Sequence, residues 1–89
     1  MHYVYILFCN QKIYYIGSTD NLERRIEQHR RGESTYTQKF SDIKLVYSEP
    51  CPTRLEAERR ELQIKGWRIA KKKALIAGDT LLLKQLSRS

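Results

Sequence analysis

The chain alternates between short apolar or aromatic runs and polar breaks. Residues 3–8 and 13–17 are β-branched, aromatic and apolar, a composition typical of strands. The residues between them, 9–12, are a polar break of turn length, so we expect an antiparallel hairpin. Residues 43–47 predict a third strand.

The first helix is predicted to begin at Asp20. Glu23 follows three residues later, a spacing in which the two side chains can each reach an orphan backbone N–H. Apolar residues then recur at helical spacing, and we expect the helix to end near Gly32. Residues 33–41 are polar and rich in Ser and Thr, which favours a loop.

The second half of the chain is predicted to be mostly helical. Thr53 and Glu56 repeat the capping spacing and begin a helix that runs to about residue 65. Residues 69–77 form a further helical stretch, and Asp79 begins a short helix in the leucine-rich tail. This order predicts an α+β fold: a three-stranded antiparallel sheet, made of the N-terminal hairpin plus a third strand, flanked by three or four helices.

The composition indicates one small folded domain. A chain of 89 residues allows a single core, and we expect residues 1–80 to form it, with 81–89 as a C-terminal helical tail. Apolar residues make up 40% and charged residues 30%, which excludes a disordered chain. The net charge of +7 predicts attraction to polyanions, with nucleic acid the most common specific partner.

Membrane, secreted and zinc-binding classes are disfavoured. The longest mostly apolar run, residues 3–9, is far shorter than the ~18 residues of a membrane span, so we expect no membrane partner. The N-terminus lacks the pattern of a signal peptide, and we expect a cytoplasmic protein. Cys9 and Cys51 belong to no closely spaced ligand pair, so we expect two free structural thiols.

Two polar side chains share a helix face with predicted core residues. Arg25 and His29 stand one turn apart, on the same face as Leu22 and Ile26. Either they lie at the edge of the apolar stripe and extend to water, or they serve a site.

Glu61 is a sharper anomaly in the second predicted helix. At about 100° per residue it lies inside an arc of apolar side chains. These are Leu55 and Leu62 on one flank and Ala57 and Ile64 on the other. A carboxylate there costs several kcal/mol unless it is paired, hydrogen-bonded or bound to a metal. An ion pair with Arg25 or Lys65 is the structural alternative to a metal site.

Together these residues resemble the GIY-YIG nuclease domain. The second half of the signature, Tyr-Ile-Gly, is intact and ends at Gly17, which lets the backbone approach closely or removes a clash. The first half reads Tyr-Val-Tyr, which keeps Tyr5 and loses the glycine. The family's arginine falls at Arg25, its histidine or tyrosine at His29, and its metal-binding glutamate at Glu61, four residues after an alanine. Over roughly residues 2–77 the chain resembles small bacterial proteins that consist of this domain alone.

The resemblance implies a metal-dependent DNA endonuclease, with a role in DNA repair or processing. Glu61 would hold one Mg²⁺ or Mn²⁺, a hard cation that keeps several waters and needs few protein ligands. Arg25 would contact a phosphate oxygen with its donor fork. Tyr5 and Tyr15 would orient or deprotonate the attacking water, and His29 is a further candidate for the base. The sequence leaves the choice among these three open.

Basic residues outside the motifs would hold the nucleic acid. They are Arg24, Arg30 and Arg31 around the first predicted helix, and Lys71, Lys72 and Lys73 after the second. For the lysines, an ordinary solvated helix face is the alternative. Phosphate contacts of this kind carry no sequence information, so we expect salt-sensitive, sequence-indifferent binding to DNA, with RNA not excluded.

Ser18 follows Gly17 at a position where the repair nuclease of this family has a lysine. The absence of this lysine and the degenerate first motif keep an alternative open, which is a non-catalytic nucleic-acid-binding or adaptor module on the same fold. We expect a monomer, with a protein partner unidentified.

Overall fold

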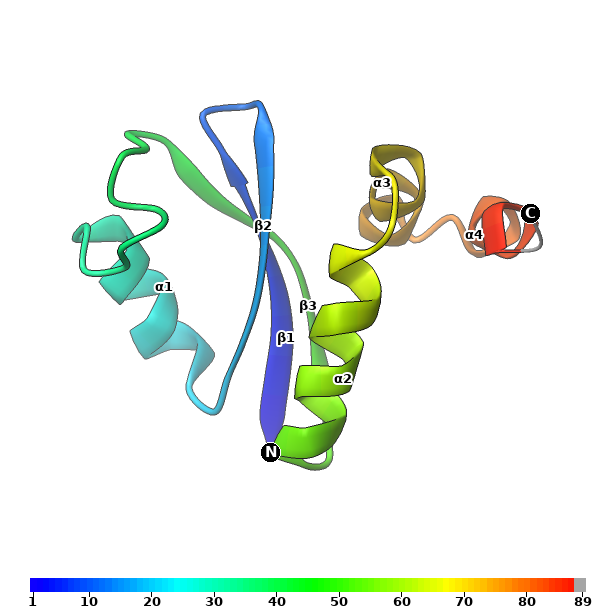
Figure 1. Cartoon of the computed structure of the whole chain (residues 1–89), viewed down its shortest axis with the longest axis horizontal. Coiled ribbons are helices and arrows are strands. Elements are labelled where there is room, and N and C mark those ends of the chain that lie inside the picture. Colours follow the sequence, from blue (N-terminus) through cyan, green and yellow to red (C-terminus); the bar gives the residue numbers. More distant parts are fainter. Residues whose placement is uncertain (88–89) are drawn as a thin grey trace.

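The computed structural model describes residues 1–87. Its elements are β1 (His2–Cys9), β2 (Ile13–Thr19), α1 (Leu22–Arg30), β3 (Ile43–Cys51), α2 (Arg54–Lys65), α3 (Ile69–Ala77) and α4 (Thr80–Ser87). The strands form one antiparallel sheet in the order β2-β1-β3, with α1 on one face and α2 on the other (Figure 1). The predicted α+β class is confirmed, with four helices in the described part of the chain. Residues 88–89 of the predicted tail lie outside it.

The hairpin turn also holds the loop that leads to β3. Asn10 and Gln11 adopt left-handed backbone conformations, with φ of 51° and 55°. Asn tolerates this region better than most residues because its short polar side chain can hydrogen-bond locally. The Asn10 side-chain oxygen accepts the backbone N–H groups of Ser41 and Asp42, at 3.1 and 2.9 Å. The end of the 31–42 loop is thus fixed to the turn of the sheet.

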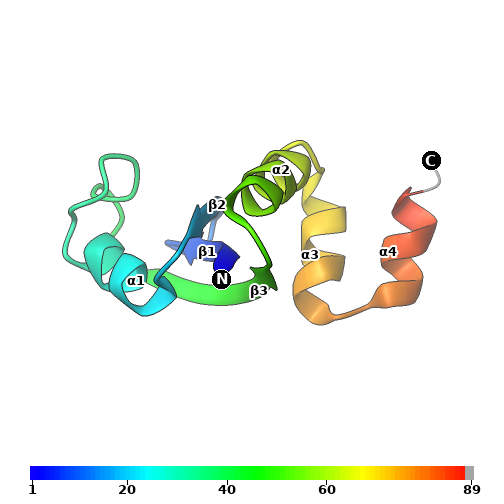
Figure 2. The ribbon, with the colours of Figure 1, turned by 90° about the horizontal axis from the view of Figure 1, so that it is seen from below.

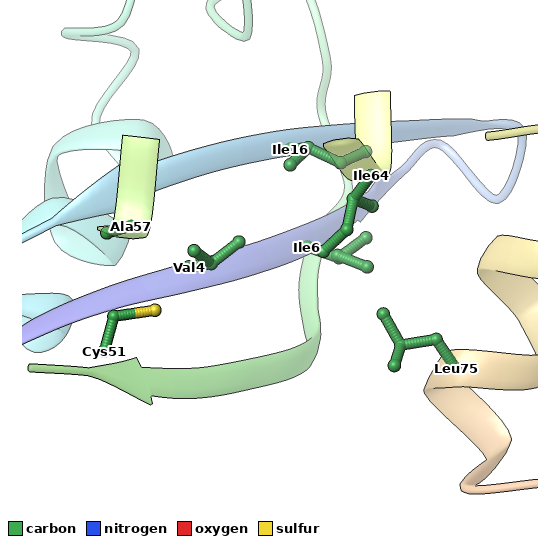
Figure 3. Close-up of a cluster of buried hydrophobic side chains, with 7 residues drawn as sticks. All are labelled: Val4, Ile6, Ile16, Cys51, Ala57, Ile64 and Leu75. Carbon is green, nitrogen blue, oxygen red and sulfur yellow. The ribbon is translucent and has the colours of Figure 1, made fainter. Parts of the chain in front are cut away.

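Alternation along the strands divides the core into two clusters, one on each face of the sheet. The cluster on the α2 face consists of Val4, Ile6, Ile16, Cys51, Ala57, Ile64 and Leu75 (Figure 3). The cluster on the α1 face consists of Tyr5, Leu7, Cys9 and Ile26. The two expected free thiols are therefore buried on opposite faces, and burial raises the pKa of each. A tyrosine in the second cluster brings a polar group into the core.

The last two helices form a pair beside α2, and α4 lies farthest from the sheet (Figure 2). α3 contributes Leu75 to the core, whereas α4 has no buried residue. In α4, Leu83 is half-buried against the core and Leu81 is 69% exposed. No helix in residues 1–87 has the length and apolar character needed to cross a bilayer.

Two predicted boundaries are wrong by a few residues. Asn21, not Asp20, caps α1: its side-chain oxygen accepts the backbone N–H of Arg24 at 3.0 Å. The Asp20 side chain instead pairs with the Arg24 guanidinium at 3.2 Å. β3 continues to Cys51 rather than ending at residue 47. The predicted stop of α1 near Gly32 is confirmed, because the helix ends at Arg30 and Gly32 follows its C-cap with a φ of 76°. The predicted cap of α2 at Thr53 is confirmed.

Candidate active site

The hydroxyl of Tyr5 connects the central strand to α1. Tyr5 is 1% exposed, and its oxygen lies 2.9 Å from Nε2 of His29. Nε of Arg25 donates to the same oxygen at 3.3 Å. Arg25 and His29 stand one turn apart on α1, so both side chains reach the same point of β1. Three of the residues suggested by the motifs are therefore in direct contact.

Gly17 makes room for the Tyr5 ring. The two residues are directly opposed in the register of β1 and β2. A Cβ atom at Gly17 would lie 2.5 Å from the Tyr5 hydroxyl oxygen and 2.6 Å from Cζ, both well inside van der Waals contact. Other residues can also adopt the φ of Gly17, so the glycine is required here by the lack of space for a side chain and not by its backbone conformation.

His29 is a core residue rather than one at the edge of the apolar stripe. It is 0% exposed, and its Nδ1 lies 2.6 Å from Oγ1 of Thr37. Burial, and secondly the charge of Arg25, lower the pKa of His29 to about 4. The ring is therefore neutral at pH 7, with both nitrogens hydrogen-bonded inside the protein.

Tyr15 and Tyr36 extend the aromatic cluster outward from Tyr5. The Tyr15 ring lies 5.1 Å from the His29 ring and 5.3 Å from that of Tyr36, measured between centroids. Tyr36 belongs to the 31–42 loop and is 49% exposed. Burial raises the pKa of Tyr5 to about 12, against the opposing effect of its hydrogen bond from Arg25. Tyr5 is thus a phenol at neutral pH in the ligand-free protein.

Glu61 comes from the other face of the sheet. Its Oε1 accepts the Ser18 hydroxyl at 2.8 Å, and its Oε2 lies 2.6 Å from the Lys65 ammonium. Lys65 is thus the cation that pairs with this carboxylate, out of the two considered from the sequence. The carboxylate does not touch Tyr5, yet its charge contributes to raising the Tyr5 pKa.

The expected apolar arc around Glu61 is only half buried. Ala57 and Ile64 are fully buried, as predicted, but Leu55 and Leu62 are 56% and 69% exposed. Glu61 therefore lies at the boundary of the buried stripe, where a carboxylate can be partly hydrated. Its side chain is 19% exposed.

Two grooves run along β2 and adjoin this carboxylate. The first contains Ser18 and is lined by His2, Ser18, Thr19, Asp20, Arg24, Arg25, Gln28, Arg54 and Glu58. The second contains Lys65 and is lined by Tyr14, Tyr15, Ile16, Tyr36, Lys65 and Lys72. Because Ser18 and Lys65 both bind Glu61, the carboxylate stands between the grooves. β2 is an edge strand, so both grooves lie at the open side of the sheet.

The six predicted nucleic-acid-binding residues do not share one surface. Arg24 lines the first groove and Lys72 the second. Lys71 instead lines a groove between α2 and α4, with its ammonium 4.3 Å from the Trp67 ring centroid. The other three line neither groove: Lys73 lines a pocket that also contains Leu82, Arg30 lines a pocket that also contains Leu45, and Arg31 pairs with Glu27 and Glu33.

A divalent cation fits at Glu61 only if most of its ligands are water molecules. Among residues 1–87 no group of three or more His, Cys, Asp or Glu side chains is placed to hold a metal. Mg²⁺ commonly keeps several waters and uses one or two carboxylates, so a single carboxylate beside the Ser18 hydroxyl meets its requirement for oxygen ligands. The Lys65 ammonium must then leave Oε2, and its side chain, 49% exposed, has room to do so.

Sequence reasoning missed the polar partners of the motif residues. In the sequence Ser18 stands out only as the replacement of a lysine, whereas in the structure it is the hydroxyl donor to Glu61. Lys65 was considered as a partner but not placed in the site, although its spacing of four from Glu61 is a recognisable signal. Thr37 and Tyr36 lie in a polar loop without periodicity, so no pattern marked them.

Comparisons with known proteins give a consistent result. The family model of the GIY-YIG catalytic domain matches residues 1–74. A UPF0213 protein of Natronomonas pharaonis is 40% identical over 80 residues, covering 89% of this chain and 94% of that protein. A UPF0213 protein of Clostridium perfringens is 40% identical over 82 residues, covering 91% and 88%. The solution NMR structure of a UPF0213 protein from Bacillus halodurans is 36% identical, with a TM-score of 0.56, over 85% of this chain and 82% of that one.

Proposed function

The chain belongs to the family of GIY-YIG catalytic domains, a nuclease superfamily that generally uses divalent metals, and we propose that it is a metal-dependent DNA endonuclease. The resemblance drawn from the motifs is thereby confirmed at the level of the family. One observation carries the finer proposal: Arg25 and Ser18, which line one groove, are bonded respectively to the Tyr5 hydroxyl and to the Glu61 carboxylate. A phosphate in this groove would meet the Arg25 guanidinium and the Ser18 hydroxyl, the two side chains that are bonded to the Tyr5 phenol and to the Glu61 carboxylate.

Arg25 is arranged to bind a non-bridging phosphate oxygen. Its Nε donates to Tyr5 at 3.3 Å and its Nη1 donates to Gln28 at 3.1 Å. These bonds, with a further hydrogen bond to Tyr15, orient the guanidinium, and its planar set of N–H donors suits a phosphate in the groove that Arg25 lines. A pre-oriented cation stabilises the charge that builds on the phosphate without reorganisation during the reaction.

Glu61 would hold one Mg²⁺ or Mn²⁺ between the grooves. A divalent ion there supplies positive charge for the phosphate and for the leaving oxygen. The Ser18 hydroxyl fixes the orientation of the carboxylate, as a hydrogen-bonded partner of a metal ligand commonly does.

The choice of base narrows to the two tyrosines. His29 is fully buried with both ring nitrogens bonded, so it has no nitrogen left for a substrate or a water. Tyr15 lines the second groove, whereas the buried Tyr5 is connected to the first groove through Arg25, and the two tyrosine ring centroids are 6.3 Å apart. We therefore assign His29 to the support of Tyr5 rather than to contact with the water.

A plasmid-nicking assay tests the proposal. Wild-type protein is incubated with Mg²⁺ or Mn²⁺, beside an EDTA control and the variants Glu61→Ala and Glu56→Ala. Glu56 is an exposed glutamate in the first turn of the same helix, so its variant controls for charge and helix composition. Metal-dependent nicking that is lost in Glu61→Ala and kept in Glu56→Ala supports the enzyme. Equal nicking in both variants excludes Glu61 as the metal ligand.

The second candidate is a binding module that lends this surface to a larger repair machine. The observation that favours this candidate is that Glu61 is already paired with the Lys65 ammonium. It predicts DNA or RNA binding that neither EDTA nor Glu61→Ala weakens, and no nicking by the wild type.

A further inference from the structure

Thr37 is a buried polar residue in the loop between α1 and β3. It is 0% exposed, and its Oγ1 lies 2.6 Å from Nδ1 of His29. On the other side of the ring, Nε2 lies 2.9 Å from the Tyr5 hydroxyl. Thr37, His29 and Tyr5 therefore form one chain of hydrogen bonds that runs from the loop through α1 to the central strand.

The backbone around Thr37 is held in place on both sides. The N–H of Phe40 donates to the carbonyl of Thr37 at 3.0 Å, and that of Gln38 donates to the carbonyl of Ser34 at 2.9 Å. Directly after Phe40, the backbone N–H groups of Ser41 and Asp42 donate to the Asn10 side chain, which fixes the end of the loop to the hairpin turn. The Thr37 hydroxyl is thus presented to His29 by a defined turn rather than by a free loop.

The chain admits two arrangements of protons. A neutral imidazole carries one N–H and one acceptor nitrogen, and His29 is neutral because its pKa is lowered to about 4. In the first arrangement Thr37 donates to Nδ1, and Nε2–H donates to the Tyr5 oxygen. In the second, Nδ1–H donates to Thr37, and Nε2 accepts the proton of Tyr5.

The two arrangements differ in which hydroxyl proton lacks a protein acceptor. In the second it is that of Thr37, whose Oγ1 has no hydrogen-bond partner besides His29 within residues 1–87. A buried donor left without a partner costs about 1–3 kcal/mol. In the first it is that of Tyr5, which is itself 1% exposed, but whose oxygen is bonded to Arg25. Because Arg25 lines the first groove, a water or substrate bound beside the guanidinium would be the acceptor. The first arrangement is therefore favoured.

We propose that Thr37 is a positioning residue that holds His29 in the Nε2–H tautomer, so that His29 donates to Tyr5 rather than accepting its proton. The Tyr5 oxygen then receives two N–H donors, one from His29 and one from Arg25. Two donors stabilise the negative charge left when the phenol gives up its proton. Once the phenol proton has passed to solvent through the groove, the Tyr5 phenolate would take a proton from the attacking water, with His29 as its support. The tautomer stands by itself, whereas its catalytic consequence rests on the proposed function.

Nitrogen NMR of the histidine rings tests the tautomer directly. In ¹⁵N-labelled full-length protein at pH 7, long-range ¹H–¹⁵N correlations distinguish a protonated Nε2 from a protonated Nδ1. We expect the Nε2–H pattern for His29 in the wild type and in Thr37→Ser, which keeps the hydroxyl. In Thr37→Val, which keeps the shape and loses the hydroxyl, we expect the Nδ1–H form to appear. His2, the second histidine of the chain, is the internal control and should be unchanged in both variants.

An Nδ1–H pattern for His29 in the wild type overturns the proposal, and so does an unchanged Nε2–H pattern in Thr37→Val. Because the wild-type spectrum alone decides the tautomer, the test survives a variant that folds poorly, and Thr37→Ala then replaces the valine. If the wild type nicks DNA, Thr37→Val should lower kcat about tenfold with little change in KM, and serine should restore it. Absence of nicking in the wild type contradicts the proposed function and leaves the tautomer result standing.

Discussion

The Tyr5 ring packs directly on the bare α-carbon of Gly17, its cross-strand partner. No side chain fits between them, since a Cβ at Gly17 would lie 2.5 Å from the Tyr5 hydroxyl oxygen. The intact Tyr-Ile-Gly triplet and the tyrosine kept from the degenerate first triplet are therefore two parts of one contact. The hydroxyl that bonds Arg25 and His29 is positioned by a missing side chain on the neighbouring strand.

Gly17→Ala should displace the Tyr5 ring and separate its hydroxyl from Arg25 and His29. Overpacking of this kind costs about 1–3 kcal/mol, so the free energy of unfolding should fall by that amount in urea titrations. Any nicking activity should fall with it. Gly66→Ala is the matched control, because a Cβ there would be 3.5 Å from its nearest neighbour. Equal stability of Gly17→Ala and the wild type would show that the ring can move without penalty.

Lys65→Gln should tighten the binding of Mn²⁺ at Glu61. The variant removes the ammonium that lies 2.6 Å from Oε2 and competes with the cation for that oxygen. A partly exposed ion pair contributes up to about 1 kcal/mol, so the Kd for Mn²⁺ should drop up to about fivefold in calorimetric titrations. Lys72→Gln removes the same charge from the same groove without touching Glu61, and should leave the Kd nearly unchanged or lower it less. A higher Kd for Mn²⁺ in Lys65→Gln would instead show that Lys65 supports metal binding at Glu61.

The elements of the fold were predictable because each leaves a local signature. Residues 3–8 and 13–17 have the composition of strands and are separated by a short polar break. The start of α2 is marked by Thr53 and by Glu56 three residues later. The environment of Glu61 was not predictable to the same degree. Helical periodicity shows which side chains share a face, but not how far the sheet reaches around the helix, and so Leu55 and Leu62 were assigned to a core that they do not enter. Thr37 was out of reach because its burial comes from a loop that folds over His29.

Acid should destabilise the fold through His29. Its pKa is about 4 in the folded protein and about 6.5 when the chain is unfolded. Between these values the unfolded state binds the extra proton, so the free energy of unfolding should fall as the pH drops from 6.5 to 4, by about 1–3 kcal/mol. Urea unfolding at pH 7 and pH 4.5 measures this difference. In His29→Gln the corresponding part of the pH dependence should disappear. A pH dependence that His29→Gln leaves intact would assign it to other groups.

The nicking rate should rise with pH across the neutral and mildly alkaline range. Tyr5, with a pKa of about 12 in the ligand-free protein, is almost entirely protonated at pH 7, and the reactive phenolate fraction grows about tenfold per pH unit. Bound cations lower this pKa and move the plateau toward neutrality, but the sign of the slope stays the same. Initial rates from pH 6 to pH 9 at constant ionic strength give the profile. A rate that is flat over this range would point to a base that is already ionised.

Lys72 and Lys71 should differ in their effect on DNA binding although they are neighbours in sequence. Lys72 lines the groove that holds Tyr15, Tyr36 and Lys65, whereas Lys71 is packed over Trp67 on another surface. A lysine that contacts a phosphate releases about one counter-ion, so Lys72→Gln should weaken binding for all sequences and lower the slope of log K against log salt by about 1. Lys71→Gln carries the same change in net charge and should leave that slope unchanged. Fluorescence anisotropy with one labelled oligonucleotide between 50 and 200 mM salt compares them. If both variants lower the slope equally, the nucleic acid follows the whole basic run of α3 instead of the groove beside Glu61.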